Sequence, residues 1–326
     1  MSMSVISNID PKLVVKHKVL NLFHSVLLLF GMILLLSFLG WAIAGKEGIK
    51  WMIFLGCLML IFGPRVSPNI ILFLYGARPL SKEELPVVFD IIYELSKRAK
   101  LEHVPRLYFI PSQIPNAFTV GIKSNAMITI TAGLLENLEL REIIGVLAHE
   151  ISHIQHNDIW IMNLSDIISR LTSIFSLTGQ LLLILNLPII VMTNYQIPWL
   201  PILILIFAPT MSTLLQLALS RTREFDADLG AAILTGDPEG LARALAKMEK
   251  CQSNIFSKIF FPGYKDPYPS LLRTHPKTEE RIKRLMSLVK TEPIHAPLYN
   301  VSEYFIPDYL LKVAQRPKWR IGGIWY

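Results

Sequence analysis

Long runs of uncharged, apolar residues set the strictest limit on how this chain can fold. The runs lie at residues 19–44, 51–62 with 70–75, 171–192 and 199–219. A helix needs about 20 apolar residues to cross the hydrocarbon core of a bilayer. We therefore predict about four transmembrane helices. The first run is too long for the core of a cleaved signal peptide, so we expect it to remain as a span.

The composition agrees with a membrane protein. Hydrophobic residues make up 52% of the chain and charged residues 17%, whereas soluble proteins carry about 25% charged residues. A buried helical hairpin in a soluble core is the alternative for the last two runs, and two uncharged runs in tandem disfavour it. Cys57 and Cys251 are too few for a disulfide framework or a cysteine zinc site.

The distribution of basic residues predicts the orientation in the membrane. The formal net charge is +7, and three lysines precede the first run, at Lys12, Lys16 and Lys18. By the positive-inside rule we expect the N-terminus and the charged soluble segments in the cytoplasm. The loops near Lys46 and Asn194 then face outside the plasma membrane, although two lysines in the first loop run against the rule. No RNA- or DNA-binding motif is present, so we expect no nucleic-acid partner.

The charged segments predict a mixed soluble domain. Ser81-Lys82-Glu83-Glu84 is a capping-box pattern, and an amphipathic helix follows it. Further along we expect a strand at 106–110, a hairpin at 118–121 and 126–131, and helices at 132–137, from 140, at 238–251 and at 278–288. The predicted fold class is α+β, predominantly helical, with a small β-sheet.

We divide the chain into five segments from these patterns. They are a cytoplasmic N-terminus at 1–18, two spans at 19–75, a first soluble part at 76–169, a transmembrane hairpin at 170–220 and a second soluble part at 221–326. The second span is short on a strict count, so its end is the least defined boundary.

The most specific motif is His149-Glu150-Ile151-Ser152-His153. On a helix, two histidines four residues apart share a face, where two imidazoles can bind one Zn²⁺. Glu150 then lies beside the metal without ligating it, where a general base must stand to deprotonate a zinc-bound water. An apolar stripe that continues to Trp160 and Ile161 predicts one continuous helix through the motif. The alternative is two surface histidines on an amphipathic helix.

A third ligand can come from Arg223-Glu224-Phe225-Asp226-Ala227-Asp228. A carboxylate is a normal third zinc ligand beside two histidines, with one position left for water. If Glu224 binds zinc, Asp228 can accept a hydrogen bond from the far nitrogen of either histidine. The alternative is an acidic helix start favoured by the helix dipole. His156 points off the ligand face, so we do not expect it to bind metal.

The motifs together resemble the HtpX-type membrane zinc metalloendopeptidases, which are relatives of the CAAX prenyl proteases. H-E-x-x-H followed by E-F-D-A-D carries the resemblance. Pro115-Asn116-Ala117-Phe118 is similar to the family's asparagine segment, and the stretch from His275 to Ile282 to its H-P-x-x-x-x-R-I signature. The resemblance covers about residues 78–288 and implies a zincin-like domain. Ser152 is a departure, since family members often have Gly there.

The resemblance also implies the roles of individual residues. Glu150 is the base, and one Zn²⁺ per chain is held by His149, His153 and Glu224. The segment Asn116, Ala117 and Phe118 leads into a strand beside the substrate cleft.

Two further residues keep two interpretations each. Either His275 or Arg281 can stabilise the oxyanion of the tetrahedral intermediate. Either can equally be structural, with Arg281 paired to Asp228 or to another carboxylate.

The predicted function is hydrolysis of peptide bonds in membrane or misfolded proteins, in membrane protein quality control, as the resemblance implies. A CAAX-type prenyl protease is an alternative, but those relatives have more spans around a large chamber. A metal transporter would carry ionisable residues inside its spans, and His24 is the one such residue in these runs. A non-enzymatic membrane metal-binding protein leaves the complete H-E-x-x-H and Glu set unexplained.

Overall fold

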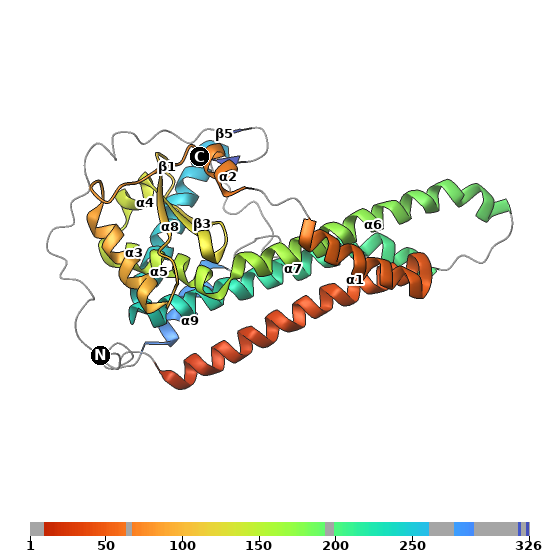
Figure 1. The fold of residues 1–326 in the computed structure, drawn as a ribbon, viewed down its shortest axis with the longest axis horizontal. Coiled ribbons are helices and arrows are strands. Elements are labelled where there is room, and N and C mark those ends of the chain that lie inside the picture. The colour runs from red at the N-terminus through yellow and green to blue at the C-terminus, as the bar shows by residue number, and fades with distance from the viewer. Residues whose placement is uncertain are drawn as a thin grey trace.

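Figure 1 shows the computed structural model of the chain as a folded domain from which long helices extend to one side. The structure describes residues 10–62, 67–192, 199–260 and 277–289, with two short strands at 319–320 and 324–325. In chain order the elements are α1 (Pro11–Phe62), α2 (Pro68–Leu74), β1 (Arg78–Pro79), α3 (Pro86–Arg98), β2 (Arg106–Ile110), β3 (Ala117–Val120), η2 (Lys123–Asn125), β4 (Met127–Thr131), α4 (Ala132–Asn137), α5 (Leu140–His156), α6 (Asp158–Met192), α7 (Trp199–Thr235), α8 (Pro238–Phe260), α9 (Thr278–Ser287), β5 (Trp319–Arg320) and β6 (Ile324–Trp325).

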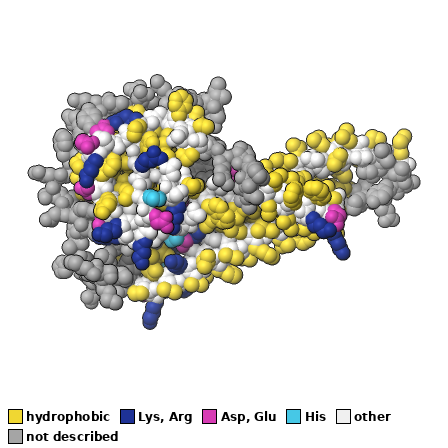
Figure 2. Space-filling model, in the orientation of Figure 1, with side chains coloured by type: hydrophobic (Ala, Val, Ile, Leu, Met, Phe, Trp, Pro, Cys, Tyr) yellow, Lys and Arg dark blue, Asp and Glu magenta, His cyan; other side chains and the backbone are white. Residues whose placement is uncertain are grey.

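Within the described residues, three helices are long and apolar enough to cross a membrane, namely α1, α6 and α7. They pack against one another. The part of them that extends beyond the folded domain carries mainly apolar side chains, with one small group of charged side chains at its far end, while most charged side chains in view lie on the domain (Figure 2). Phe30 is 59% exposed and Leu185 is 73% exposed, which is costly in water and is what a bilayer would cover.

The count of three differs from the predicted four because α1 contains the first predicted span and residues 51–62 of the second. The other part of the second predicted span, 70–75, falls largely in the short helix α2, where Leu72 packs against Val120 and Met127 of the sheet. The backbone leaves the helical region at Ala44 and Gly45, and Gly45 has a φ of 59°. The chain reverses at this break, so Gly40 and Gly48 meet across it. A Cβ built on Gly48 would lie 1.9 Å from the carbonyl oxygen of Gly40, so a side chain there would push the two arms of α1 apart.

The predicted small sheet is present with four strands in the order β1-β2-β4-β3. Strands β2 and β4 are parallel, and β3 and β4 form the predicted antiparallel hairpin, with Phe118 opposite Thr129. All five residues of β4 are buried, and β4 is one of the two inner strands, whereas β3 is an edge strand. Helix α5 packs against β3 on one side and against α7 and α8 on the others.

The helix predicted to follow Ser81 begins four residues later than the capping-box pattern implies. The main-chain N–H of Ser81 donates to Glu84 Oε2 at 2.9 Å, but these residues form a turn before the helix. Helix α3 starts at Pro86. Proline suits the first helical position because it lacks the N–H that would be unpaired there, and it keeps Leu85 out of the helical region.

The helix that carries the H-E-x-x-H motif is also shorter than predicted. It ends at His156, because Asn157 adopts a left-handed conformation with a φ of 57°. Asparagine is one of the few residues that tolerates this conformation at a helix end. The prediction that the motif lies inside a helix is confirmed, but that helix does not continue to Trp160 and Ile161. The apolar stripe continues across the break in a second helix, α6, whose first residue is Asp158.

Candidate active site

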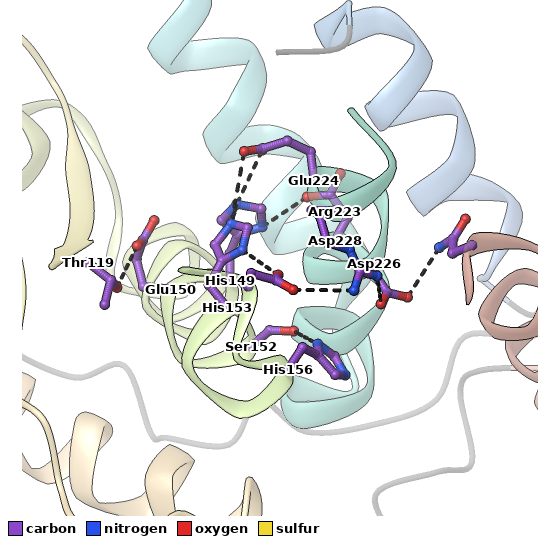
Figure 3. A network of polar contacts seen from close by, with 12 residues as sticks. Thr119, His149, Glu150, Ser152, His153, His156, Arg223, Glu224, Asp226 and Asp228 are labelled. Atoms are coloured by element: carbon purple, nitrogen blue, oxygen red, sulfur yellow. Dashed lines mark hydrogen bonds and ion pairs between the residues drawn. The ribbon is translucent and has the colours of Figure 1, made fainter. Parts of the chain in front are cut away.

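Two histidines and a glutamate converge on one point between α5 and α7. His149 and His153 lie one turn apart on α5, and Glu224 reaches them from α7 (Figure 3). The two Nε2 atoms are 3.1 Å apart. Glu224 places Oε2 at 3.5 Å from Nε2 of His149 and Oε1 at 4.0 Å from Nε2 of His153. The structure thus brings together the three ligands that the sequence predicted.

The spacing of these atoms fits a metal ion. Ligand atoms about 2.0 Å from a tetrahedral zinc ion stand about 3.3 Å from one another. The outer ring nitrogens of both histidines, Nδ1, face the carboxylates of Asp228 and Asp158, so the two Nε2 atoms are the ones on the side of Glu224. The donor set of two imidazoles and a carboxylate is one that Zn²⁺ accepts.

Carboxylates behind each histidine hold its ring. Asp158, the first residue of α6, places Oδ2 at 2.8 Å from Nδ1 of His153. Asp228 on α7 places Oδ1 at 3.1 Å from Nδ1 of His149, at an angle poor for a hydrogen bond. Such partners fix the tautomer and orientation of a ligating histidine. Sequence reasoning proposed Asp228 for this position and missed Asp158.

Arg281 on α9 closes the site from the other side. Its guanidinium makes a two-pronged contact with Asp228, with Nε to Oδ2 at 2.8 Å and Nη2 to Oδ1 at 2.6 Å. It also lies 3.1 Å from Oε2 of Glu224. Burial alone would lower the pKa of Arg281, but Asp228 and Glu224 raise it above its usual value. The sequence left two roles open for Arg281, oxyanion stabilisation or a structural pair with a carboxylate. The structure contains the pair with Asp228.

The same carboxylates control the charge of His149 when no metal competes. Burial lowers the pKa of His149, but the contacts with Asp228 and Glu224 outweigh burial and raise that pKa to about 10. A metal ion must displace this proton, since a ligating imidazole is neutral. The strongly acidic surroundings therefore favour a cation at this point, whether it is a proton or a metal.

Glu150 lies beside the three ligands but turns toward the sheet. It is 7% exposed, and its Oε2 accepts a hydrogen bond from Oγ1 of Thr119 at 2.8 Å. Thr119 stands in the edge strand β3, so this bond links the glutamate to the sheet edge (Figure 3). Sequence reasoning missed Thr119. The alternation of side chains along a strand was the available signal, because it places Ala117 and Thr119 on one face.

The edge strand presents two different faces. Ala117 packs on the core that contains α5, whereas the ring of Phe118 lies 5.2 Å from that of Tyr75. Asn116 is anchored by its backbone, because its N–H donates to Oγ1 of Thr131 at 2.9 Å and its carbonyl accepts from the N–H of Thr131 at 3.1 Å. Among the described residues, the Asn116 side chain makes no hydrogen bond.

Comparison with known proteins decides the family. The profile of peptidase family M48 matches residues 84–289, which includes all the described residues of the site named so far except Tyr75. The chain belongs to peptidase family M48. It is therefore a metalloendopeptidase, as predicted, and the transporter alternative no longer stands.

Individual M48 relatives are similar along nearly their whole length. The chain is 32% identical over 292 residues to "Protease HtpX homolog" of Campylobacter concisus, covering 82% of this chain and 97% of the relative. It is 33% identical over 293 residues to a protein of the same name from Sulfurihydrogenibium sp., covering 83% and 97%. The crystal structure of S. mikatae Ste24p matches with a TM-score of 0.45 and 21% identity, over 83% of this chain and 66% of that one.

The M48 chain is a membrane metalloprotease of the HtpX group. Ser152, at the position where the resemblance led us to expect glycine, places its Oγ 3.2 Å from Nδ1 of His156. Gly230 of α7 makes room for it, because a Cβ there would lie 1.9 Å from that oxygen. His156 therefore contacts Ser152 and stands outside the group of three ligands. His275 lies outside the described residues.

Proposed function

We propose that this M48 peptidase is a zinc-dependent endopeptidase that cleaves membrane proteins or misfolded proteins as part of membrane protein quality control. The convergence of His149, His153 and Glu224 beside Glu150 is the observation that carries the proposal. Glu224 follows the last apolar run, 199–219, by five residues, which is about 7.5 Å along a helix. A site so close to the membrane surface favours substrates that are themselves held in the membrane.

Each residue then has a part in peptide hydrolysis. Zinc bound to the three ligands would polarise the scissile carbonyl and bring the pKa of a bound water to about 7. Glu150 takes the proton of the attacking water and returns it to the leaving amine. Thr119 holds Oε2 of Glu150. Arg281 and Asp228 keep Glu224 and His149 in place, and His275 remains a candidate for oxyanion stabilisation.

We further propose that substrate binds along β3 as an added strand. An edge strand offers unpaired main-chain groups, and an extended peptide can pair with them while one carbonyl lies at the active site. The contact between Thr119 and Glu150 supports this edge as the one nearest the chemistry. Asn116 and Ala117 stand at its start. The ring of Phe118 contacts the ring of Tyr75 and so helps to hold the strand in place.

Asn116→Ala tests the substrate edge. Because the backbone and not the side chain of Asn116 is bonded to Thr131, we expect kcat/KM to fall about tenfold. The zinc content and Tm should stay at the parent values. Thr131→Val is the comparison variant, since it removes the hydroxyl that holds this turn. It should lower Tm, and if Asn116→Ala lowers Tm and activity together in the same way, Asn116 closes a turn and does not bind substrate.

We place the active site on the cytoplasmic side of the plasma membrane, with the five segments of the chain arranged as the sequence predicts. Basic residues before the first span favour this orientation. Helix α1 turns back at Ala44 and Gly45, at a point away from the folded domain (Figure 1), and Lys46 follows this turn in the sequence. In this orientation the active site lies on the cytoplasmic side, at the end of α7 that is part of the folded domain.

Cysteine labelling tests this orientation in intact cells. In a chain with Cys57 and Cys251 replaced by serine, a membrane-impermeant maleimide should modify a cysteine at Lys46. It should miss one at Glu136, which is exposed on the folded domain. Permeabilised cells supply the control, since both positions should react there. Labelling of Glu136→Cys but not Lys46→Cys in intact cells would reverse the proposed topology.

A further inference from the structure

A buried network of polar contacts joins the first membrane helix to the ligand His153. Its members come from four helices and are listed in order as Asn21 of α1, Asp226 and Arg223 of α7, Asp158 of α6 and His153 of α5. The first four are all less than 10% exposed. Burying a polar side chain costs free energy unless it finds a partner. A network of several buried polar residues therefore needs an explanation.

The network of polar contacts begins inside the apolar run of α1. Asn21 is 5% exposed, and its side-chain N–H donates to Oδ1 of Asp226 at 3.3 Å. These two residues are 205 positions apart in the sequence. An amide can satisfy a buried carboxylate oxygen without adding a charge, and loss of the amide would leave that oxygen unpaired.

In the middle of the network, a guanidinium lies between two carboxylates. Arg223 pairs with Oδ2 of Asp226 through Nη2. Its Nη1 lies 3.4 Å from Oδ1 of Asp158, which is an ion-pair distance but not a hydrogen bond. Figure 3 shows Arg223 and Asp226 side by side on α7 behind the ligands. One cation shared by two buried anions is sensitive to either partner, because a shift toward Asp226 weakens the hold on Asp158.

The network of polar contacts ends at the proposed metal ligand His153. The other oxygen of Asp158, Oδ2, lies 2.8 Å from Nδ1 of His153. Asp158 is in place because α5 ends at Asn157 and α6 begins directly after it. Asp158 therefore contacts His153 through one oxygen and lies at ion-pair distance from Arg223 through the other.

We propose that Asn21 is a positioning residue for the zinc site: it holds Asp226 and Arg223 so that Asp158 orients His153. The membrane helix α1 is then part of the support of the metal centre as well as an anchor in the bilayer. This proposal rests on the proposed zinc endopeptidase function. It predicts that the packing of α1 against α7 changes the affinity for zinc.

Zinc affinity of the full-length, detergent-solubilised protein tests the proposal, with a chromophoric chelator as competitor. We expect Asp158→Asn to weaken zinc binding about 10- to 100-fold, the range for a direct partner of a ligating histidine, and Asn21→Leu about three- to tenfold. In the Asp158→Asn background, Asn21→Leu should cause no further loss, because the route from Asn21 to His153 is already cut.

Ser25→Ala is the matched control on the same helix. Ser25 is buried one turn after Asn21, and its hydroxyl donates to the carbonyl of Asn21 at 2.8 Å. It contacts its own helix, so its removal should leave the dissociation constant for zinc unchanged. If Asn21→Leu does not fold, Asp226→Asn replaces it in the same cycle, because it keeps the shape of the side chain and removes the charge that Arg223 pairs with.

The outcomes separate this proposal from the function beneath it. A parent protein that binds no zinc contradicts the zinc endopeptidase itself. A parent that binds zinc, with an Asn21→Leu variant that binds it equally well, overturns only the role of Asn21. Losses from Asn21→Leu and Asp158→Asn that simply add would also overturn it, since they would show two independent effects.

Discussion

Glu150→Gln will lose proteolysis while it keeps its metal. The substitution preserves the size of the side chain and can still accept the hydrogen bond that Thr119 donates at 2.8 Å. It removes the group that takes up the proton, and a positioned general base contributes about 10²- to 10⁴-fold to a rate. We expect kcat to fall by about 10³-fold. The zinc content should equal that of the parent, because Glu150 is not one of the three converging ligands.

Cleavage of casein and metal content by mass spectrometry, on the same detergent-solubilised sample, measure both effects. Glu136→Gln is the matched control, since Glu136 is an exposed glutamate on the same domain, and it should retain full activity. If Glu150→Gln cleaves casein as fast as the parent, Glu150 is not the base and the assignment of the chemistry is wrong.

Glu224→Ala will lose the metal itself. It removes the one carboxylate among the three ligands, and it deprives Arg281 of a partner at 3.1 Å. Even the outer partners of metal ligands are worth about 10- to 100-fold in affinity, so loss of a ligand should cost about 100-fold or more. Activity should fall with the metal content, and added zinc at high concentration should restore part of both.

Glu142→Ala separates loss of metal from loss of fold. Glu142 is also a buried glutamate, but it caps the start of α5, where its Oε2 accepts from the N–H of Glu139 at 2.8 Å. Its removal should lower the free energy of unfolding by about 1 kcal/mol. The zinc affinity should stay at the parent value. Equal losses of zinc in Glu142→Ala and Glu224→Ala would mean that Glu224 acts through stability and not as a ligand.

The part of the site that sequence could predict is the part encoded by local spacing. His149 and His153, like Glu224 and Asp228, are four residues apart, and a helix places such pairs on one face whatever surrounds it. Spacing alone did not bring the two pairs together: the family resemblance implied it, and the packing of α5 against α7 places His149, His153 and Glu224 at one point.

The residues that sequence missed depend on tertiary geometry. Asp158 reaches His153 because the helix breaks at Asn157, and an apolar stripe that continues across a break hides it. Thr119 meets Glu150 across a sheet-to-helix contact 31 residues away. A single amide such as Asn21 does not interrupt an apolar run, and its partner lies 205 residues further on.

The fold shows the same division. The apolar runs and the hairpin strands follow from composition and alternation, so they were predictable. The reversal of α1 at Gly45, with Gly40 against Gly48, depends on how two helix arms pack. The parallel pairing of β2 with β4 also required the tertiary structure, because no short turn connects them.

One side-by-side measurement tests the central claim most directly: zinc content and casein cleavage of the parent, Glu150→Gln and Glu224→Ala, purified without added metal. We predict one zinc ion and full activity for the parent, one zinc ion and almost no activity for Glu150→Gln, and little of either for Glu224→Ala. Proteolysis by a parent that holds no metal, or zinc retained in full by Glu224→Ala, would contradict a zinc endopeptidase built on His149, His153 and Glu224.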